Sequence, residues 1–330
     1  ERFKAGELTI YDEIPGWEVE NFVANPDFQM YEFTTRSWTY VGFNLADPNN
    51  PQNAYDEDGN YIEQDPHPIL ADVLVRQALS YAVDIDAVIE TYKGGLSVNI
   101  GAPTIPGYPD YNPDLLIEFN PDLSMELLDE AGWVMEDGDY RVCRGCAYTE
   151  INPDYEGTEL ALTWMVVSGL GENFENYMNF MAEQWRAIGV NIDAQFVDYG
   201  TVIGPAVDAQ TFDMYYLGWR LGLPADPDKI DIFGINADVV DAGYNSGSYH
   251  SPELDQLFLD ARNPELTDNC NMDVRAELYK EANVILNHDL PYLFLWTNKG
   301  FTVAQNDLEN WNPAPQFRFQ NEDAWVVKTN

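Results

Sequence analysis

The sequence predicts an α/β fold, and three observations support this. Residues 157–167 have the composition of a strand, residues 174–188 form an amphipathic helix closed by Gly189, and residues 190–196 alternate as a second strand. This strand–helix–strand order is typical of a parallel pair joined by a right-handed crossover. A hydrophobic content of 45% with 14% aromatic residues over 330 residues indicates a large folded core in one big domain or two smaller ones.

The net charge excludes several partners. Sixteen Lys and Arg residues stand against 57 Asp and Glu, which gives −41. A field of that sign repels nucleic acids and anionic lipids, so polyanion binding is not expected. The acidity favours solubility and suggests a saline or extracellular setting.

The N-terminal quarter is predicted to consist of short extended segments and one short helix, followed by a long surface loop. We expect a strand at 7–11, a helix from Pro15 to about residue 24, and strands at 28–33 and 38–44. Residues 47–68 are rich in Pro, Asn and acids, with a hairpin tip at 56–59. A calcium loop is the alternative for this tip, but Ala54 occupies the first ligand position, so a plain turn is favoured.

The rest of the chain alternates helices and strands. Apolar spacing predicts a helix within 69–83, and Asp84 caps a second helix that ends at Lys93 before two glycines. A Pro/Gly loop at 101–113 precedes a helix at about 123–131. Further helices at 251–262 and 272–288 are followed by strands at 292–296 and 301–304.

The segment 212–229 is the candidate binding element. An apolar and aromatic strand breaks there into a Gly/Pro loop that carries Trp219, Arg220 and Asp226. A flat ring, a permanent cation and a carboxylate therefore lie at the mouth of a strand, where ligands collect in open α/β sheets. The alternative is that Trp219 caps the core and Arg220 pairs with a nearby acid.

The three cysteines do not define a metal site. Cys143 and Cys146 have the CxxC spacing, but no second pair completes a tetrahedral set, and the histidines are scattered. A structural disulfide that closes a tight loop is favoured, with reduced thiols and a metal or redox role as alternatives. No dinucleotide loop, phosphate loop or GxSxG elbow occurs, so no cofactor, metal or catalytic residue is expected.

Segments distributed along most of the chain resemble one family. The stretch VRQALSYAVD at 75–84 resembles the signature helix of extracellular solute-binding proteins of the peptide/nickel type, family 5, which feed ABC importers. Further matching segments keep the family's order. They are KAGELTI at 4–10, YVGFN at 40–44, LLDEAGW at 127–133, IGVNI at 188–192, FD at 212–213, GW at 218–219, ADP at 225–227, SPELD at 251–255 and DLP at 289–291.

The resemblance implies a periplasmic-binding-protein-like fold of the type II, bilobal hinge family. Residues 1–46 and 297–330 then resemble later pieces of the first lobe, and 47–296 resemble the complete second α/β lobe, so this chain looks like a C-terminal fragment. The implied function is capture of peptides or another mid-sized polar solute between the lobes and its delivery to the permease subunits of the importer. The protein is then a non-enzymatic, extracytoplasmic monomer, periplasmic or anchored through the missing N-terminal portion. The alternatives are an oligosaccharide-binding member of the same family and, from another class, a secreted hydrolase.

The family pattern transfers unevenly to individual residues. The implied ligand-binding positions are Tyr40, Val41, Gly42, Tyr216, Trp219, Arg220 and Asp226. In similar peptide binders an aspartate shortly after the Gly-Trp pair holds the ammonium group of the peptide, whereas Arg220 follows the pair here and the nearest acid is Asp226. Arg220 suits a carboxylate or a stacked ring instead. In an exported protein we expect a Cys143–Cys146 disulfide, with Cys270 unpaired or bonded outside this chain.

Overall fold

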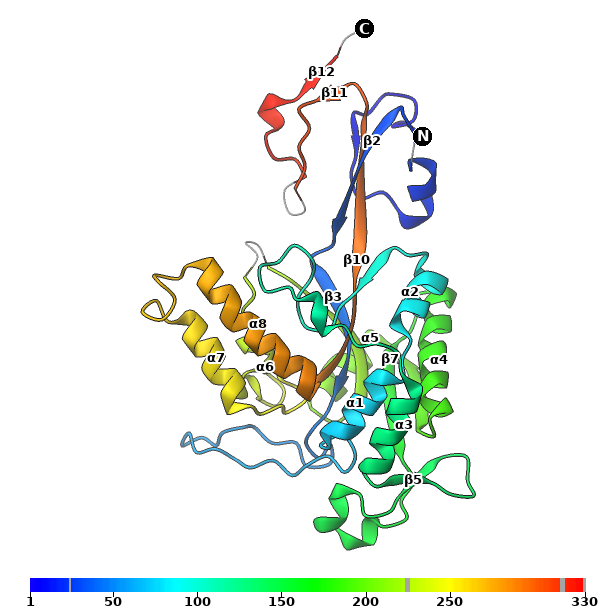
Figure 1. Ribbon diagram of the computed structural model, residues 1–330, viewed down its shortest axis with the longest axis vertical. Helices are drawn as coiled ribbons and strands as arrows, with labels where there is room; N and C mark the ends of the chain where they lie inside the picture. Colours follow the sequence, from blue (N-terminus) through cyan, green and yellow to red (C-terminus); the bar gives the residue numbers. More distant parts are fainter. Residues whose placement is uncertain (24, 223–225, 315–317, 329–330) are drawn as a thin grey trace.

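The chain folds into two parts joined by long strands. The computed structural model describes residues 1–23, 25–222, 226–314 and 318–328. A large lobe holds the α-helices around a mixed sheet, and a smaller upper part consists of the described residues of 1–34 and 299–328 (Figure 1). The predicted α/β class is confirmed.

One sheet runs through both parts. Its strand order is β1-β10-β3-β9-β7-β8, and β2 and β4 also pair with β10. The bounds are β1 (Ile10–Tyr11), β2 (Phe28–Thr34), β3 (Ser37–Phe43), β4 (Ser97–Asn99), β7 (Ala161–Val167), β8 (Asn191–Val197), β9 (Met214–Arg220) and β10 (Tyr292–Gln305). β7 pairs in parallel with β8, as the strand–helix–strand pattern predicts. β7 is also parallel to β9, and β3 is antiparallel to β9 and β10.

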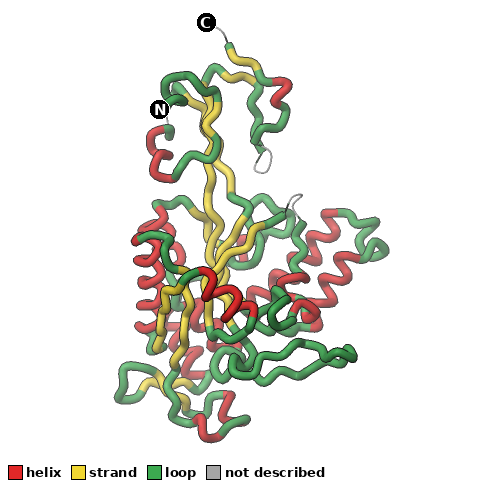
Figure 2. The backbone as a smooth tube through the Cα atoms, turned by 180° about the vertical axis from the view of Figure 1, so that it is seen from behind, coloured by secondary structure: helices red, strands yellow, loops and turns green. Residues whose placement is uncertain are grey.

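The strand β10 crosses from one part to the other (Figure 2). The sequence predicts two strands here, but 292–305 is one continuous strand, so that expectation was wrong. Its first half pairs with β3 and its second half with β2, and Lys299 opposite Thr34 continues the ladder. Gly300 looks like a break but marks a close approach, because a Cβ there would lie 2.5 Å from the Phe33 ring.

The helices begin largely where their capping residues predict. Asp72, Asp84, Asn120, Ser251 and Asn271 each accept a backbone N–H at a helix start. The α-helices are α1 (Val73–Tyr81), α2 (Ile85–Lys93), α3 (Pro121–Glu130), α4 (Glu172–Ala187), α5 (Tyr199–Val202), α6 (Ile230–Phe233), α7 (Pro252–Arg262) and α8 (Met272–Asp289). Short helices of other types lie at η1 (Gly16–Asn21), η2 (Pro113–Leu115), η3 (Ala147–Glu150), η4 (Pro153–Tyr155), η5 (Ile203–Asp208), η6 (Ile235–Ala237) and η7 (Glu322–Ala324).

The N-terminal segment is less regular than its sequence predicts. The strand expected at 7–11 is reduced to Ile10 and Tyr11, and the helix expected from Pro15 to residue 24 is only the 3₁₀ segment η1. Six residues are too few to repay helix nucleation without tertiary support. The upper part also contains the short pair β11 (Leu308–Glu309) and β12 (Val326–Val327).

Two apolar cores cover the two faces of the sheet in the large lobe. One joins β7 and β8 to α1–α4 and includes Trp164, Trp185 and Met181, so the aromatic and Met stripe of α4 is core, as expected. The other joins β3, β9 and β10 to α7 and α8 and includes Phe258 and Tyr279. A third, small core around Phe3, Val19, Phe22 and Phe301 belongs to the upper part.

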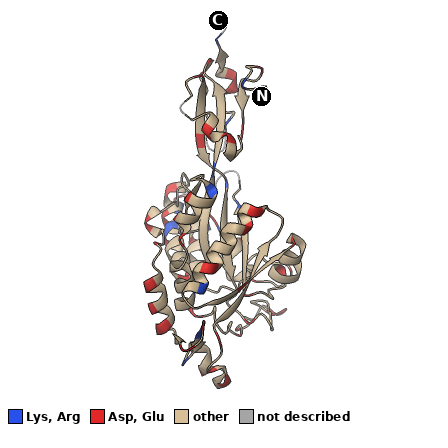
Figure 3. Ribbon diagram, turned by 90° about the vertical axis from the view of Figure 1, so that its right-hand side faces the viewer, with Lys and Arg blue, Asp and Glu red and all other residues tan. Residues whose placement is uncertain are grey.

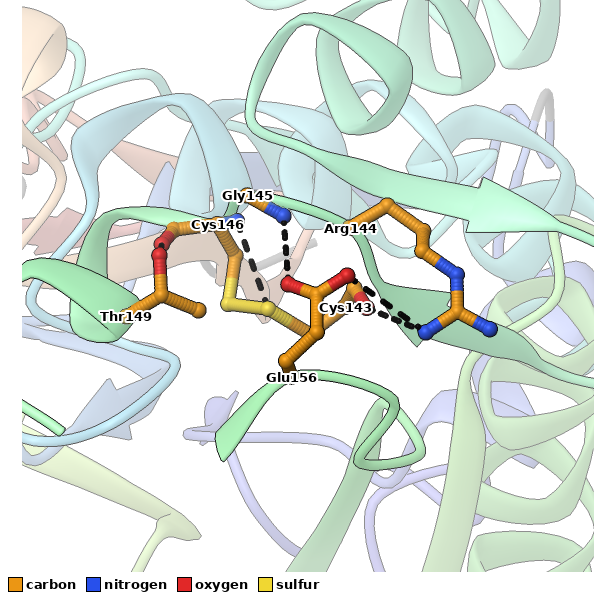
Figure 4. The surroundings of a disulfide bond; sticks show 6 residues. All are labelled: Cys143, Arg144, Gly145, Cys146, Thr149 and Glu156. Carbon is orange, nitrogen blue, oxygen red and sulfur yellow. Dashed lines mark hydrogen bonds and ion pairs between the residues drawn. A yellow bond between two sulfur atoms is a disulfide. The ribbon is translucent and has the colours of Figure 1, made fainter. Parts of the chain in front are cut away.

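The CxxC segment lies in a hairpin at the far end of the large lobe, formed by β5 (Trp133–Met135) and β6 (Arg141–Cys143). Cys143 and Cys146 form a disulfide, with the Gly145 N–H donating to the Glu156 carboxylate across the loop (Figure 4). Cys270 is exposed and free.

Acidic residues lie over both parts of the molecule, whereas basic residues are few (Figure 3). Within the described residues, no helix combines the length and apolarity that a membrane span requires.

Candidate functional site

The parallel strands point their carboxyl ends toward the upper part. β7, β8 and β9 run in one direction, so the residues that follow them share one edge of the sheet, here called the carboxyl edge. Ligands in open α/β sheets collect beyond such an edge. Three cavities lie around it, and two of them are lined from both parts of the molecule.

The first cavity, here called the lysine cavity, has a volume of about 390 Å³. Lys93 at the end of α2 and Asn173 and Tyr177 on α4 line it from the large lobe. Ile14 and Phe301 line it from the upper part. Because its two walls belong to different parts, a change in their relative position would open or close it.

Lys93 is a cation held among aromatic rings. Its Nζ lies 4.9 Å from the centre of the Trp296 ring and 5.6 Å from that of Tyr177. Burial lowers the pKa of Lys93 to about 8. Tyr216, a predicted site residue, lies behind this wall, with its ring edge-on to Phe174 at 5.5 Å.

The second cavity, here called the aromatic cavity, has a volume of about 400 Å³ and contains two predicted site residues, Tyr40 and Trp219. Trp219 is partly buried, its ring lies edge-on to Tyr244 at 5.2 Å, and its buried Nε1 has no hydrogen-bond partner among the described residues. Tyr199 and Tyr244 on the cavity wall are 61% and 58% exposed, so their rings are open to a ligand.

Tyr40 is held rigidly in the floor of the aromatic cavity. Its ring stacks on Tyr292 with centroids 4.1 Å apart, and its hydroxyl lies 3.4 Å from that of Tyr215. Burial raises the pKa of all three tyrosines, so their hydroxyls stay neutral. Val41 faces the opposite core, and Gly42 makes room for Tyr215, whose ring would lie 2.4 Å from a Cβ at that position.

The third cavity, here called the arginine cavity, has a volume of about 270 Å³. It brings Arg220, a predicted site residue, together with Arg36 and Arg318. Asp226 is not in any of the three cavities, because it forms an ion pair with Arg275 on α8 at 3.1 Å. The structure therefore groups Tyr40, Trp219 and Arg220 along one edge and places Asp226 away from it.

Lys93, Asn173, Tyr177 and Arg36 line these cavities but were not among the predicted site residues. Lys93 precedes two glycines and reads as an ordinary helix C-terminal cation, which the helix dipole favours. The sequence signals only that cations are scarce, 16 against 57 acids, and which of them lack a carboxylate partner becomes visible in the structure.

Two parts joined by crossing strands are the arrangement expected of the bilobal hinge fold. The family model of bacterial extracellular solute-binding proteins, family 5 Middle, matches residues 1–239. The chain belongs to this family.

Curated relatives agree with this assignment. The oligopeptide-binding protein AppA of Bacillus subtilis is 22% identical over 98% of this chain and 53% of its own length. The dipeptide-binding protein of Escherichia coli is 26% identical over 76% of this chain and 43% of its own. The chain thus spans about half the length of these relatives.

Two solved structures illustrate the likeness in fold. HbpA2 from Haemophilus parasuis has a TM-score of 0.75 at 19% identity and covers 99% of this chain and 55% of its own. AppA from Bacillus subtilis in complex with a nonapeptide has a TM-score of 0.66 at 20% identity, over 99% of this chain and 57% of its own.

Proposed function

We propose that this chain is part of the solute-binding component of an ABC importer, which captures a solute between two hinged lobes and delivers it to membrane permease subunits. The observation that carries this proposal is the lysine cavity, which is lined from both the large lobe and the upper part. A ligand that contacts both walls binds the closed state better than the open state and so shifts the hinge equilibrium. Family membership supports the same role.

The proposed solute is a peptide or a similar mid-sized polar molecule. The aromatic cavity offers apolar area for a side chain beside Trp219, and the two cationic cavities offer charge for its polar ends. The names of the curated relatives, oligopeptide-binding and dipeptide-binding, point the same way. The contact residues are Tyr40, Trp219 and Arg220, with Tyr216 and Gly42 shaping the walls.

The setting follows from the same assignment. The protein acts outside the cytoplasm, as a non-enzymatic monomer that an N-terminal segment outside this chain anchors to the cell. We assign 47–296 to its second lobe and 1–46 with 297–330 to part of its first lobe, except that β3 (Ser37–Phe43) lies in the sheet of the large lobe. The rings of Trp219, Tyr199 and Tyr244 favour an oligosaccharide as the second candidate solute, because aromatic faces stack on sugar rings.

The test is mass spectrometry of small molecules released from the purified intact protein, followed by calorimetric titration of the ligand-free protein with what is found. We expect peptides or similar polar solutes that raise the melting temperature when added back. Oligosaccharides would support the second candidate. A protein that carries nothing, and that neither peptides nor oligosaccharides stabilise, would contradict the proposal.

A further inference from the structure

The arginine cavity stands out when every cation of the chain is matched to a carboxylate. Most of the 16 Lys and Arg side chains form ion pairs, as expected with 57 acids. Of the exceptions among the described residues, Arg76 and Lys229 are buried and donate to backbone carbonyls. Lys93 lies against aromatic rings. The remaining two, Arg36 and Arg220, line the same cavity.

Backbone pairing holds these two arginines next to each other. Ser37, which follows Arg36, is the register partner of Arg220 between β3 and β9. The N–H of Leu221, which follows Arg220, donates to the carbonyl oxygen of Arg36 at 2.8 Å. Because paired residues share a face and successive residues alternate, this register directs the two side chains to opposite faces of the sheet, and both border the cavity from one rigid corner at the carboxyl edge.

The third arginine of the cavity is already neutralised. Arg318 donates to Asp12 at 2.7 Å and to Glu13 at 2.6 Å, and its guanidinium lies 4.5 Å from the centre of the Phe33 ring. Glu13 also lines the cavity, but its carboxylate is occupied by this ion pair. Two guanidinium groups thus remain without a carboxylate, beside the Thr35 and Ser37 hydroxyls, which lie 3.1 Å from each other.

Two cations that line one cavity repel each other, and an anion bound in the cavity offsets that repulsion. Guanidinium groups present paired N–H donors that match the two oxygens of a carboxylate or phosphate. The net charge of −41 repels anions from the rest of the surface, so a locally cationic cavity selects where an anionic group can bind.

We infer that the arginine cavity is a subsite for an oxyanion group of the captured solute, between Arg36 and Arg220. This inference rests on the proposed function and specifies it: the solute carries a carboxylate, or another planar or tetrahedral oxyanion, and a free ammonium group is not what this end of the cleft recognises. For a peptide, the group is the terminal carboxylate or an acidic side chain.

The test uses native mass spectrometry of the ligand-free intact protein with three forms of an equimolar tripeptide library: free, N-acetylated and C-terminally amidated. We expect acetylation to change the bound fraction by less than about threefold relative to the free form. Amidation should lower the bound fraction about tenfold, the usual value of one charge-assisted pair. In R36Q/R220Q the free form should fall to the level of the amidated form, and amidation should make no further difference. R220K, which keeps the charge and the fold, should lose part of the affinity.

The matched control is K280Q/K328Q, which removes two exposed, ion-paired cations elsewhere and so changes the net charge equally. It should bind like the wild type. If the amidation penalty persists in R36Q/R220Q, the carboxylate is bound elsewhere and the inference is wrong, although the proposed function stands. If no library form binds, the peptide proposal fails, and titration with citrate and inorganic phosphate decides the subsite: binding that R36Q/R220Q abolishes supports it, and no binding overturns it.

Discussion

At the scale of single residues, comparing Trp219 with a buried tryptophan distinguishes a role in ligand binding from a role in core packing. Its ring is partly buried, lies edge-on to Tyr244 and lines the aromatic cavity, so the same side chain both packs in the fold and borders the cavity. Its cross-strand partner Trp38 is fully buried in the core. The two tryptophans therefore serve as a matched pair, because they differ mainly in access to the cavity.

We expect Trp219→Ala in the intact protein to weaken solute binding by about 1–2 kcal/mol, the value of a central aromatic anchor, and to leave the fold intact. Trp38→Ala should instead lower the free energy of unfolding by about 3–5 kcal/mol. Calorimetric titration and thermal melts on both variants measure this. A large fall in melting temperature with unchanged affinity for Trp219→Ala would show that Trp219 is a packing residue.

The lowered pKa of Lys93 predicts how solute binding depends on pH. An anionic group of the solute in the lysine cavity favours the charged ammonium, so it raises the pKa of Lys93 back above about 8. Affinity for an anionic solute should therefore fall as pH rises above 8, where the free protein loses this charge. Burial raises the pKa of the neighbouring Tyr177 well above its ordinary value, so its hydroxyl stays neutral over this range. The decline should be absent in Lys93→Met, and titration at pH 7, 8, 9 and 10 decides the matter.

The free energy of unfolding should change with pH in the opposite direction to the affinity. The folded state binds the Lys93 proton less tightly than the unfolded state, whose lysine pKa is 10.5, so between pH 8 and 10.5 the unfolded chain carries more protons. The free energy of unfolding contributed by this group then rises with pH across that window, by roughly 2 kcal/mol. Denaturant unfolding of wild type and Lys93→Met at pH 8 and 10 should show this rise in the wild type alone.

At the scale of elements, the sequence predicts what periodicity and capping determine. The helix α4 and the strands on either side of it follow from apolar spacing, and α2 and α7 begin after the caps Asp84 and Ser251. The continuous strand β10 could not be predicted this way, because Lys299 and Gly300 look like a break and only pairing with β2 reveals otherwise. Lys93 and Arg36 were missed for the same reason: their lack of a carboxylate partner is a tertiary property.

The close approach at Gly300 gives a test of this crossing strand. We expect Gly300→Ala to lower the free energy of unfolding by about 1–3 kcal/mol, because the new methyl group meets the Phe33 ring, as in an overpacked core. Phe33→Leu removes the edge of that ring. The double variant Gly300→Ala/Phe33→Leu should therefore be more stable than the sum of the two single effects indicates. If the free energies of unfolding measured with denaturant are simply additive, the contact does not exist.

At the scale of the whole molecule, the two chain ends are joined in the upper part by charge. Arg318 near the C-terminus binds Asp12 and Glu13 near the N-terminus, and the Thr302 hydroxyl on β10 also donates to Asp12. The core of the upper part is small compared with the two cores of the large lobe. The upper part therefore depends more on this ion-pair cluster, and it carries one wall of both the lysine and the arginine cavity.

Acid should loosen the upper part before the large lobe. Burial alone would raise the pKa of Asp12, but the hydrogen bonds from Arg318 and Thr302 and the charge of Arg318 outweigh it, so its pKa lies below the ordinary 3.8. A carboxylate of this kind stabilises the folded state above pH 3.8, and that contribution is lost as pH falls through the lower, folded value. Hydrogen exchange of the intact protein at pH 5 and 3 should show protection lost in β1, β2 and the second half of β10 while β7 and β8 stay protected. Asp12→Asn should lose this protection in the upper part already at pH 5. The control Glu322→Gln, which changes an exposed acid outside the cluster, should not. Simultaneous loss of protection in all strands would show that the two parts unfold as one unit.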